Sequence, residues 1–479
     1  MRRSIRVVGI GISVMLGVLA VAAGYHQAVA GDRYRNDLRN PRAIAAVEDR
    51  GRILTTDGRV AAVSVDDDGR VGRRYPAAER YAHPVGHATL LFGDTAIEAR
   101  RADDLRSPPP DSLASLIRRL LGDDLTPHDI VITIDDTVQQ TAAAGLGDQR
   151  GAVVALDAAT GEIVAWVSTP AYDPNRLTGP AAGPAGEELA SRTDLPLVDR
   201  VRQAVYPPGS TFKVLVAAAA LDAGLSPDSP LDDLAEYRAP GTERPITNFR
   251  DGPCEDGSTI TLSDALVVSC NTAFAALGVE LGGERISTAS QDAGFGERVP
   301  FELATEIGFV PDADALDADL PALAQSSIGG RDVRVTPLQM ALVAAAVANG
   351  GEAPRPVIVD RVIDRDEIVD ETQPIFWRRM FTAPTAAALR EMMIAVVERG
   401  TGSTARTDGV VIGGKTGTAE VPDAAPHTWF IAFAEHGERR LALAVLVENG
   451  GALGDEGTGG RVAAPIARSV IEAWMRSGS

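Results

Sequence analysis

The pattern of apolar and polar positions first marks an apolar run near the N-terminus, which is long for the core of a signal peptide. Residues 7–24 form an uncharged stretch of 18 residues, and three arginines within the first six positions precede it. Such a stretch approaches the roughly 20 residues that span a bilayer, and preceding arginines favour a cytoplasmic N-terminus. We therefore expect residues 1–30 to form a basic tip and a retained transmembrane anchor, with the rest of the chain exported. A cleaved signal peptide is the alternative, because "AVA" before Gly31 has the small residues of a cleavage site.

Turn signals then divide residues 31–147 into short elements. Asp57-Gly58 and Asp68-Gly69 separate apolar patches, which predicts short strands. The stretch "SPPPDS" predicts a linker, and the following "SLASLIRRLLG" predicts a short amphipathic helix. "DIVITIDDTVQQTAAAGL" predicts a strand that leads into a helix. We expect these residues to form a small N-terminal α+β module.

Residues 148–479 have strand patterns at both ends and helical patterns between them. "GAVVALDAATGEIVAWVSTP" contains two apolar runs around a turn, which predicts a hairpin. Ala-rich helical runs follow, and strand patterns return at "HTWFIAFAE" and "RRLALAVLVENG" before a closing helix, "APIARSVIEAWMRS". The first and last strands can therefore pair in one sheet, so this part of the chain is expected to be a single α+β domain.

The charge and the cysteine content narrow the classes of function. The net charge of −20 argues against a phosphate-binding surface, and so against nucleic acid as a partner. Cys254 and Cys270 are the only two cysteines, and in an oxidising compartment we expect them to form a disulfide. Together with six scattered histidines they give no cluster with metal-ligand spacing, so no metal site is expected.

Lysine is rare in this chain, and its two positions are informative. Of the 46 basic residues only Lys213 and Lys415 are lysine, and the others are arginine. Lysine can lose its proton in a protein, whereas arginine does not. The two lysines are therefore candidates for chemistry that arginine cannot perform.

Lys213 lies three residues after Ser210 in "YPPGSTFKVLVAAAALDAG", where an Ala-rich helix is predicted to begin. This spacing places both side chains on one face of the first turn. The partial positive charge of a helix N-terminus favours a serine alkoxide, and a neutral lysine could accept the serine proton. Burial and a second nearby cation would lower the lysine pKa towards that role. For this motif alone, the alternative is an N-capping serine beside a solvated lysine.

Two further motifs complete a pattern. "SDALVVSCNTAF" contains Ser269-Cys270-Asn271, and "VIGGKTGTAE" contains Lys415-Thr416-Gly417-Thr418. The order S-x-x-K, S-x-N, K-T-G is the signature of serine enzymes that transfer acyl groups and bind penicillin. The sequence therefore predicts an acyl-enzyme on Ser210.

The third motif also matches the signature of a different class of protein. "GVVIGGKT", residues 409–416, matches the phosphate-binding loop of NTPases. That loop requires a helix directly after the lysine, whereas here Gly417 follows at once and another apolar strand pattern comes next. A P-loop NTPase is therefore a remote alternative. A purely structural or peptidoglycan-binding module would leave the positions of both lysines unexplained.

These motifs resemble those of class B penicillin-binding proteins, and among them the penicillin-binding protein A group of actinobacteria. The resemblance runs from "RGRILTTDGRVAA" through "GAVVALDAATGEIVAWVSTPAYDPN" to "GTGSTA" and "GGRVAAPIARSVIEAW". It implies a penicillin-binding/serine β-lactamase-like transpeptidase domain over residues 148–479, with an antiparallel sheet and an all-helical subdomain. It also implies that residues 31–147 are a non-catalytic dimerisation or interaction module. The chain departs from the family at Asp199, where asparagine is usual, and in "SSIGGRD", an altered form of the usual "IGQG" turn.

The resemblance implies a peptidoglycan D,D-transpeptidase that uses no cofactor. Ser210 would attack the D-Ala–D-Ala bond of a stem peptide, and an amine of a second stem would then take the acyl group. Lys213 would be the general base for acylation. Ser269 would relay a proton to the leaving amine, and Asn271 would bind the donor's amide. A D,D-carboxypeptidase and a β-lactamase or β-lactam sensor are alternatives within the same fold.

The segment from Lys415 through Gly417 to Thr418 would bind substrate. Lys415 would supply positive charge, while Thr416 and Thr418 would bind the terminal carboxylate. Backbone N–H groups of Ser210 and Thr418 would form an oxyanion hole, and a β-lactam would trap Ser210 as a stable ester. Expected partners are stem peptides ending in D-Ala-D-Ala, β-lactams, the cytoplasmic membrane, a glycosyltransferase and divisome proteins.

Overall fold

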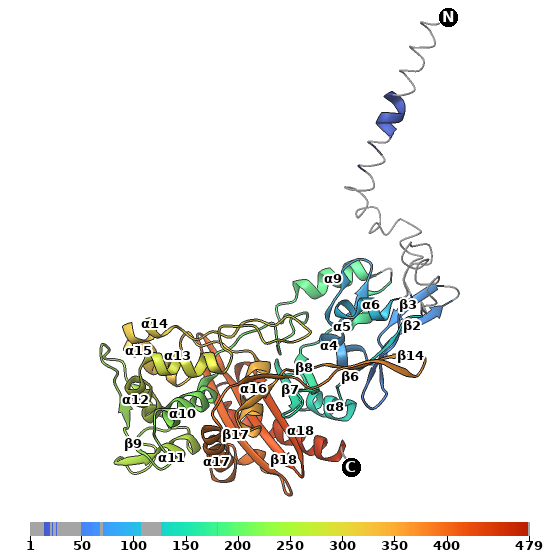
Figure 1. Cartoon of the computed structure of the whole chain (residues 1–479). Coiled ribbons are helices and arrows are strands. Elements are labelled where there is room, and N and C mark those ends of the chain that lie inside the picture. The colour runs from blue at the N-terminus through green and yellow to red at the C-terminus, as the bar shows by residue number, and fades with distance from the viewer. Residues whose placement is uncertain are drawn as a thin grey trace, which may run out of the picture.

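The computed structural model describes residues 49–67, 70–106, 126–179 and 181–477, together with 14–19, 22 and 25. Two sheets organise these residues, and a group of helices lies at the end of the molecule far from the N-terminus (Figure 1). Most of the predicted anchor, and the predicted linker and helix within residues 107–122, lie outside the described residues. Within the described ranges, no helix combines the length and the apolar character needed to cross a bilayer.

The first sheet has six strands in the order β15-β14-β6-β1-β2-β3. Four come from the beginning of the body: β1 (Ile53–Thr55), β2 (Val60–Asp67), β3 (Arg70–Arg74) and β6 (Asp129–Ile132). β6 lies parallel to β1, and all other pairs are antiparallel. The predicted strands on either side of both turns are therefore confirmed.

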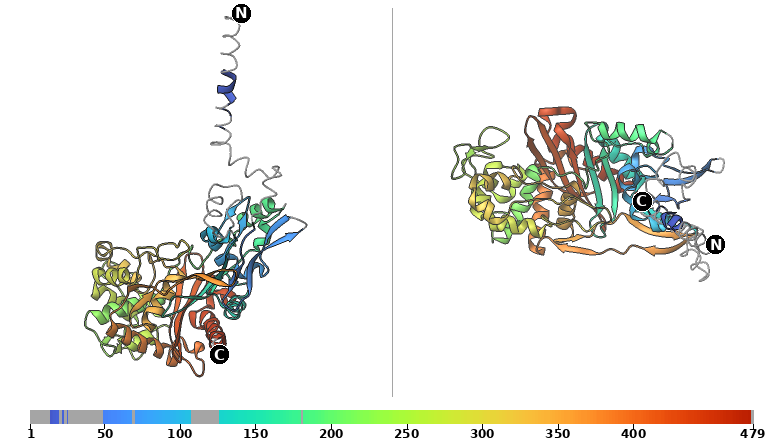
Figure 2. Two further views of the ribbon diagram at one scale, coloured as in Figure 1. Left: turned by 45° about the vertical axis from the view of Figure 1, so that its right-hand side comes forward. Right: turned by 90° about the horizontal axis from the view of Figure 1, so that it is seen from above.

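The outer two strands of this sheet come from much later in the chain. β14 (Val359–Asp364) and β15 (Glu367–Glu371) form a hairpin that pairs with β6. In Figure 2, seen from above, this orange segment runs from the body of the molecule to the N-terminal module. Residues 359–371, which lie inside the predicted second domain, thus complete the sheet of the first.

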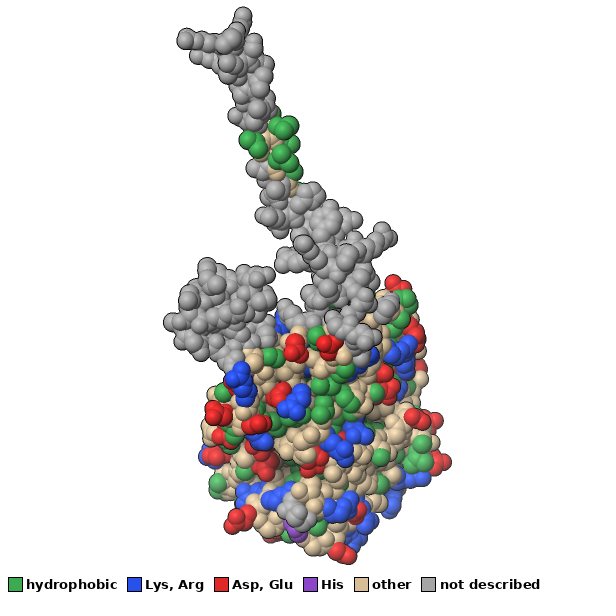
Figure 3. All heavy atoms as spheres, turned by 90° about the vertical axis from the view of Figure 1, so that its right-hand side faces the viewer, with side chains coloured by type: hydrophobic (Ala, Val, Ile, Leu, Met, Phe, Trp, Pro, Cys, Tyr) green, Lys and Arg blue, Asp and Glu red, His purple; other side chains and the backbone are tan. Residues whose placement is uncertain are grey.

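Short elements complete the N-terminal module around a buried ion-pair cluster. They are α4 (Ala82–Val85), β4 (Ala88–Thr89), β5 (Gly93–Asp94), α5 (Ala96–Arg100) and α6 (Ala102–Leu105). The carboxylate of Glu98 is fully buried and lies 2.9 Å from Arg50 and 2.6 Å from Arg73. On the face shown in Figure 3, acidic and basic side chains are interspersed over the surface.

The second sheet has five antiparallel strands in the order β17-β18-β19-β7-β8. Its strands are β7 (Gly151–Asp157), β8 (Ile163–Thr169), β17 (Val411–Val421), β18 (Ala424–His436) and β19 (Arg439–Val447). β19 pairs with β7, so the first and last segments of the domain lie side by side as the sequence predicts. The predicted 151–170 hairpin is also confirmed.

Alternate residues of this sheet face two helical layers. Val153 and Ala155 of β7 belong to the core cluster formed with α8 (Asp136–Leu146) and α18 (Ala464–Ser477). Ala152 and Val154 belong instead to the cluster with α16 (Pro337–Ala348). Every residue of α16 is buried, and all but Gln339 are apolar, as expected of a helix that is hydrophobic nearly all round.

A mainly helical region extends from the second sheet. It contains α10 (Lys213–Asp222), α11 (Leu262–Val267), α12 (Asn271–Leu281), α13 (Gly283–Asp292), α14 (Ala313–Ala318) and α15 (Leu320–Ser327). It also contains two short ribbons, β9 (Pro230–Asp232) with β12 (Thr259–Thr261) and β10 (Glu236–Tyr237) with β11 (Ile246–Thr247). The predicted subdomain is therefore not entirely helical, because the connection between α10 and α11 folds into these ribbons.

Further elements connect these layers. They are α9 (Ala182–Ser191), the pair β13 (Glu352–Pro354) and β16 (Phe376–Arg379), and α17 (Ala383–Arg399), which packs against β17. β17 is the edge strand of the second sheet. Its free edge is therefore available to groups from the helical region.

Candidate active site

Ser210 lies where the helical region meets the edge of the second sheet. It belongs to a 3₁₀ turn, Gly209–Phe212, that leads directly into α10, so its backbone is at a helix N-terminus. Gly209 has a φ of 54°, and a Cβ on it would lie 2.6 Å from the carbonyl oxygen of Thr418. A Cβ on Gly417 would lie 2.8 Å from the carbonyl oxygen of Pro208. Two glycines thus allow β17 to approach the Ser210 turn closely.

Lys213 is fully buried beneath this turn. Its Nζ donates hydrogen bonds to the carbonyl oxygen of Ser269 at 2.7 Å and to Oδ1 of Asn271 at 2.8 Å. Burial lowers the pKa of Lys213 well below the ordinary lysine value, and the nearby charge of Lys415 lowers it further. Both effects disfavour the ammonium form.

Lys415 approaches Ser269 from β17. Its Nζ donates to Oγ of Ser269 at 2.8 Å and to the carbonyl oxygen of Thr416 at 3.0 Å. Nζ of Lys213 lies 3.4 Å from that same Oγ. Burial lowers the pKa of Lys415 to about 7. Lys415 is therefore a second lysine whose amine contacts the same hydroxyl as Lys213.

The contacts of Lys213 suit a neutral amine. A neutral amine has two N–H groups and one lone pair, and the two short acceptors, on Ser269 and Asn271, match the two N–H groups. The third contact of Nζ, to Oγ of Ser269, is longer at 3.4 Å, and a neutral amine carries a lone pair that can accept a proton. No hydrogen bond of the Ser210 hydroxyl occurs within the described part of the chain, and catalytic contacts often tighten only when substrate is bound.

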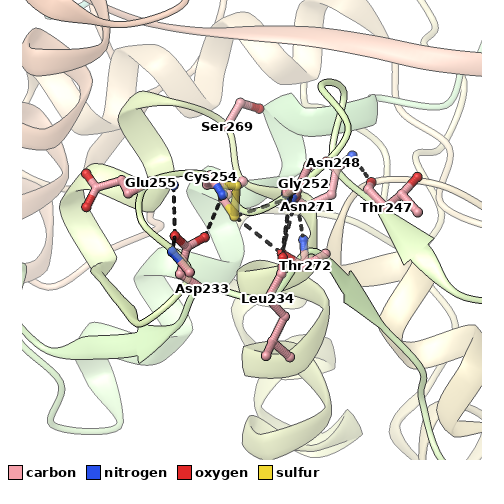
Figure 4. Close-up of a disulfide and its surroundings, with 12 residues drawn as sticks. Asp233, Leu234, Thr247, Asn248, Gly252, Cys254, Glu255, Ser269, Asn271 and Thr272 are labelled. Atoms are coloured by element: carbon pink, nitrogen blue, oxygen red, sulfur yellow. Dashed lines mark hydrogen bonds between the residues drawn. A yellow bond between two sulfur atoms is a disulfide. The ribbon is translucent and has the colours of Figure 1, made fainter.

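Ser269 occupies the tight connection between α11 and α12. Its φ of 62° is in the left-handed region, which is uncommon for residues other than glycine. Oδ1 of Asn248 holds the start of α12 by accepting from the backbone N–H groups of Asn271 and Thr272 at 2.9 and 3.1 Å. Nδ2 of Asn271 donates to the carbonyl oxygen of Thr247 at 3.0 Å (Figure 4). The loop around residue 248 therefore supports the S-x-N motif, a role that its sequence did not reveal.

The predicted disulfide is confirmed. Cys254 and Cys270 are bonded, and their Cα atoms lie 5.8 Å apart. Asp233 holds the other end of the bridge, because its carboxylate accepts from the backbone N–H of Cys254 at 2.6 Å and of Glu255 at 2.8 Å (Figure 4). Since both sulfur atoms are in the bridge, the nearby Asp233 does not form a metal site with two free thiolates. The bridge fixes the residue between Ser269 and Asn271.

We expect reduction of this bridge to lower the free energy of unfolding by about 3 kcal/mol on the chain-entropy model. The loop that it closes has a sequence separation of 16 residues. Thermal melts with and without reductant would measure the loss, and a Cys254→Ser/Cys270→Ser variant should show no response to reductant. An identical melting temperature for the reduced and oxidised wild type would contradict the expectation.

The two threonines of the K-T-G segment differ in their exposure to solvent. Thr416 is buried, and its Oγ1 lies 2.7 Å from Oγ1 of Thr401. Thr418 is half-exposed. The contact of Thr401 was not predicted, although "GTGSTA" marks its position as a family landmark. Thr418 is therefore the more accessible of the two predicted carboxylate ligands in this structure.

The phosphate-loop interpretation of residues 409–416 is wrong. Val411–Val421 is one continuous strand, and β18 follows it after a short turn. No helix begins directly after Lys415, so this segment does not present the N–H groups of a helix N-terminus to a phosphate.

The two lysines give the acylation rate a predicted dependence on pH. Lys213 must be neutral to act as a base, so the rate should rise as Lys213 loses its proton, well below the usual lysine range. Lys415 must be charged to attract a carboxylate, so the rate should fall again above about pH 7. The two lysines interact, so the rising and falling parts of this bell-shaped profile report the titration of the pair and not of either lysine alone.

The second-order rate of acylation by a fluorescent penicillin, followed from about pH 5 to about pH 10, would test this profile. A rate that kept rising to about pH 10, where an ordinary lysine titrates, would contradict it.

Two family models match the chain. The model of the penicillin-binding protein transpeptidase domain matches residues 151–472, and that of the penicillin-binding protein A dimerisation domain matches residues 50–126. The chain is 38% identical to peptidoglycan D,D-transpeptidase PbpA of Mycolicibacterium smegmatis, over 100% of both chains. It is 36% identical to PbpA of Mycobacterium tuberculosis, over 99% of both.

Solved structures show the same similarity. The ceftriaxone acyl-enzyme of penicillin-binding protein A from M. tuberculosis matches with a TM-score of 0.82 and 36% identity, over 89% of this chain and 98% of that one. The penicillin G acyl-enzyme of the same protein matches with a TM-score of 0.80 and 36% identity, over 89% and 100%. Both are acyl-enzyme complexes of that protein with a β-lactam.

Proposed function

The chain belongs to the penicillin-binding protein transpeptidase family, and from this membership and the geometry of the site we propose that it is a peptidoglycan D,D-transpeptidase that β-lactams acylate. The observation that carries the proposal is the convergence of Lys213 and Lys415 on Ser269, next to the turn that bears Ser210. Membership alone gives the reaction class, whereas this convergence supports the role that we propose for each residue.

Acylation begins at Ser210. Its hydroxyl transfers a proton to the neutral amine of Lys213, and Oγ attacks the carbonyl carbon of the penultimate D-Ala. The tetrahedral oxyanion receives hydrogen bonds from the backbone N–H groups of Ser210 and Thr418, which the close approach at Gly209 brings together. Such preorganised donors often make the largest single contribution to the rate enhancement of acyl transfer.

The leaving amine then takes a proton through Ser269. Lys213, now protonated, lies 3.4 Å from Oγ of Ser269, and Lys415 donates to the same oxygen. The C–N bond breaks, D-Ala leaves with this proton, and Lys213 is neutral again. An acceptor amine next attacks the ester carbon and passes a proton by way of Lys213 to Oγ of Ser210, the bond between the acyl carbon and Oγ breaks, and the Ser210 hydroxyl is restored. Water in place of the amine would give a D,D-carboxypeptidase, which remains the second candidate.

Substrate contacts follow from the same arrangement. Oδ1 of Asn271 accepts from Lys213, and Nδ2 donates to the carbonyl oxygen of Thr247. In the proposed complex Asn271 also binds the donor's amide. Lys415 and the half-exposed Thr418 receive the terminal carboxylate, and Thr416 contributes once its contact with Thr401 opens. No metal or cofactor has a part in these steps.

The setting of the enzyme is also proposed. The uncharged stretch 7–24 after three arginines supports a single membrane anchor with an extracytoplasmic catalytic domain. Because the 148–479 domain joins existing glycan strands through their peptides, it needs strands made by a glycosyltransferase, and we propose such a partner together with divisome proteins. Fractionation of cells that express the full chain tests the anchor, since release by high salt alone would contradict it.

A turnover experiment separates the two candidate reactions. The protein is incubated with a stem pentapeptide ending in D-Ala-D-Ala, with and without an excess of a D-amino acid as acceptor, and products are identified by mass. A transpeptidase gives the exchanged peptide as the main product when the acceptor is present. Release of the hydrolysed tetrapeptide at the same rate with and without acceptor would favour the carboxypeptidase.

A further inference from the structure

The segment that leads to Ser210 is attached to the second sheet through a buried carboxylate that the proposed reaction does not use. Glu448 directly follows β19 and is 8% exposed. Its Oε1 accepts hydrogen bonds from the hydroxyl of Tyr206 and from Nε of Arg200, both at 2.8 Å. Its Oε2 lies 2.8 Å from the guanidinium of Arg150. Tyr206 precedes Ser210 by four positions.

The other attachments of residues 206–209 are neutral. The backbone of Tyr206 exchanges two hydrogen bonds with Val335, both at 2.9 Å. Nε1 of Trp429 donates to the carbonyl oxygen of Pro207 at 3.0 Å, and the N–H of Gly209 donates to Gly329 at 3.0 Å. Glu448 therefore makes the charge-assisted contact of this segment, and such contacts are roughly twice as strong as neutral ones.

The charge states of this cluster keep the contact in place. Burial by itself raises the pKa of Glu448, but Arg200, the hydroxyl of Tyr206 and Arg150 together hold it below its usual value. Burial and the charge of Glu448 raise the pKa of Tyr206, so its hydroxyl stays a donor. The ring of His427 also faces Tyr206, edge to face at 5.4 Å, while its Nδ1 accepts from the N–H of Asn449.

We infer that Glu448 and Tyr206 are positioning residues for acylation, which hold Ser210 in line with Lys213 and with the edge of β17. This inference rests on the proposed function. Pro207 and Pro208 follow Tyr206, and their rings fix φ, so a displacement of Tyr206 passes along the chain instead of being absorbed. The carbonyl of Pro208 also lies against Gly417, so the same displacement would disturb the approach of β17.

A positioning role predicts which kinetic constant changes. Glu448 and Tyr206 lie behind the Ser210 turn and make none of the proposed contacts with the substrate carboxylate or amide. Their removal should therefore lower the first-order acylation constant and leave the noncovalent dissociation constant of the β-lactam nearly unchanged. A purely structural role would instead lower the fraction of folded protein and leave both constants of the folded enzyme as they are.

The experiment uses Tyr206→Phe, Glu448→Gln and the double variant, with nitrocefin or a fluorescent penicillin followed by stopped flow. Tyr206→Phe should lower the acylation constant about tenfold and Glu448→Gln about 100-fold, the scale of a small misplacement of a reacting group. The double variant should be no slower than Glu448→Gln, because both substitutions act on the same contact between Tyr206 and Glu448. Glu435→Gln on β18, which breaks the 2.6 Å pair with Arg390 of α17, is the matched control and should leave the constant unchanged.

Three outcomes would overturn the inference: an unchanged acylation constant in both single variants, a loss that appears in the dissociation constant alone, or additive losses in the double variant. If Glu448→Gln does not fold, Tyr206→Phe decides, because it removes only a hydroxyl. A wild-type protein that forms no adduct at all would count against the proposed function and not against this inference, which concerns how the variants differ from it.

Discussion

Lys213→Arg is expected to lower the rate of acylation by penicillin about 10²–10⁴-fold, the usual contribution of a general base. Arginine keeps the positive charge but does not give up its proton in a protein. The position is fully buried, and Nζ has two short contacts, to Ser269 and Asn271, that a planar guanidinium cannot reproduce. The measurement is the second-order acylation rate with a fluorescent penicillin, with circular dichroism melts to show that the variant folds.

Lys415→Arg provides the comparison. Arginine at this position still supplies charge beside Ser269 and the substrate carboxylate, so the rate should fall less than in Lys213→Arg. Lys213→Met, which is uncharged and similar in length, should be as slow as Lys213→Arg. A near-normal rate in Lys213→Arg, or a clearly greater loss in Lys415→Arg, would show that the two roles are assigned wrongly.

Ser269→Ala should slow acylation by about 100-fold, because the proton path to the leaving group passes through its hydroxyl. The two lysine amines lie 2.8 and 3.4 Å from this oxygen. Its removal also leaves the buried Lys415 with one hydrogen bond fewer, which lowers the pKa of Lys415 further. The alkaline limb of the pH profile should therefore move to lower pH in the same variant.

Ser269→Gly separates the hydroxyl from the backbone strain. Glycine suits the φ of 62° at this position, so Ser269→Gly should melt at a higher temperature than Ser269→Ala and yet be equally slow. Ser263→Ala, at a half-buried serine of α11, should retain the wild-type rate. Recovery of the rate in Ser269→Gly would mean that strain, and not the hydroxyl, explains the loss.

Much of the site could be predicted from the sequence because each motif carries its own local signal. The helix after Ser210 follows from the Pro-Pro-Gly punctuation and the alanines that come next, and α10 begins at Lys213. The strand at Lys415 follows from its apolar flanks. The scarcity of lysine singles out Lys213 and Lys415, and the structure brings both to Ser269.

The contacts that tune the site could not be predicted, because they join residues that are far apart in the sequence. Asn248 supports α12 from a loop with no periodic pattern, and Thr401 meets Thr416 only because β17 packs against α17. Glu448 lies 242 residues after Tyr206, and nothing local distinguishes it from a surface carboxylate. The altered "SSIGGRD" turn also proved to touch the site, since the N–H of Gly209 donates to Gly329.

The boundary between the two domains also depends on contacts between residues that are far apart in the sequence. The hairpin of β14 and β15 lies within the stretch that reads as catalytic domain, yet its strands complete the sheet of the N-terminal module. Strand pairing depends on a partner, and the partner of β14 is β6, more than 200 residues earlier. Periodicity predicts that a strand exists but does not identify the sheet that it joins.

The most direct test of the central claim is the intact mass of the protein after incubation with penicillin G, followed by peptide mapping. The account predicts a mass increase of one penicillin per chain, located on the peptide that contains Ser210 and absent from Ser210→Ala. An unmodified Ser210 peptide in protein that melts cooperatively, or an adduct on any other residue, would contradict it.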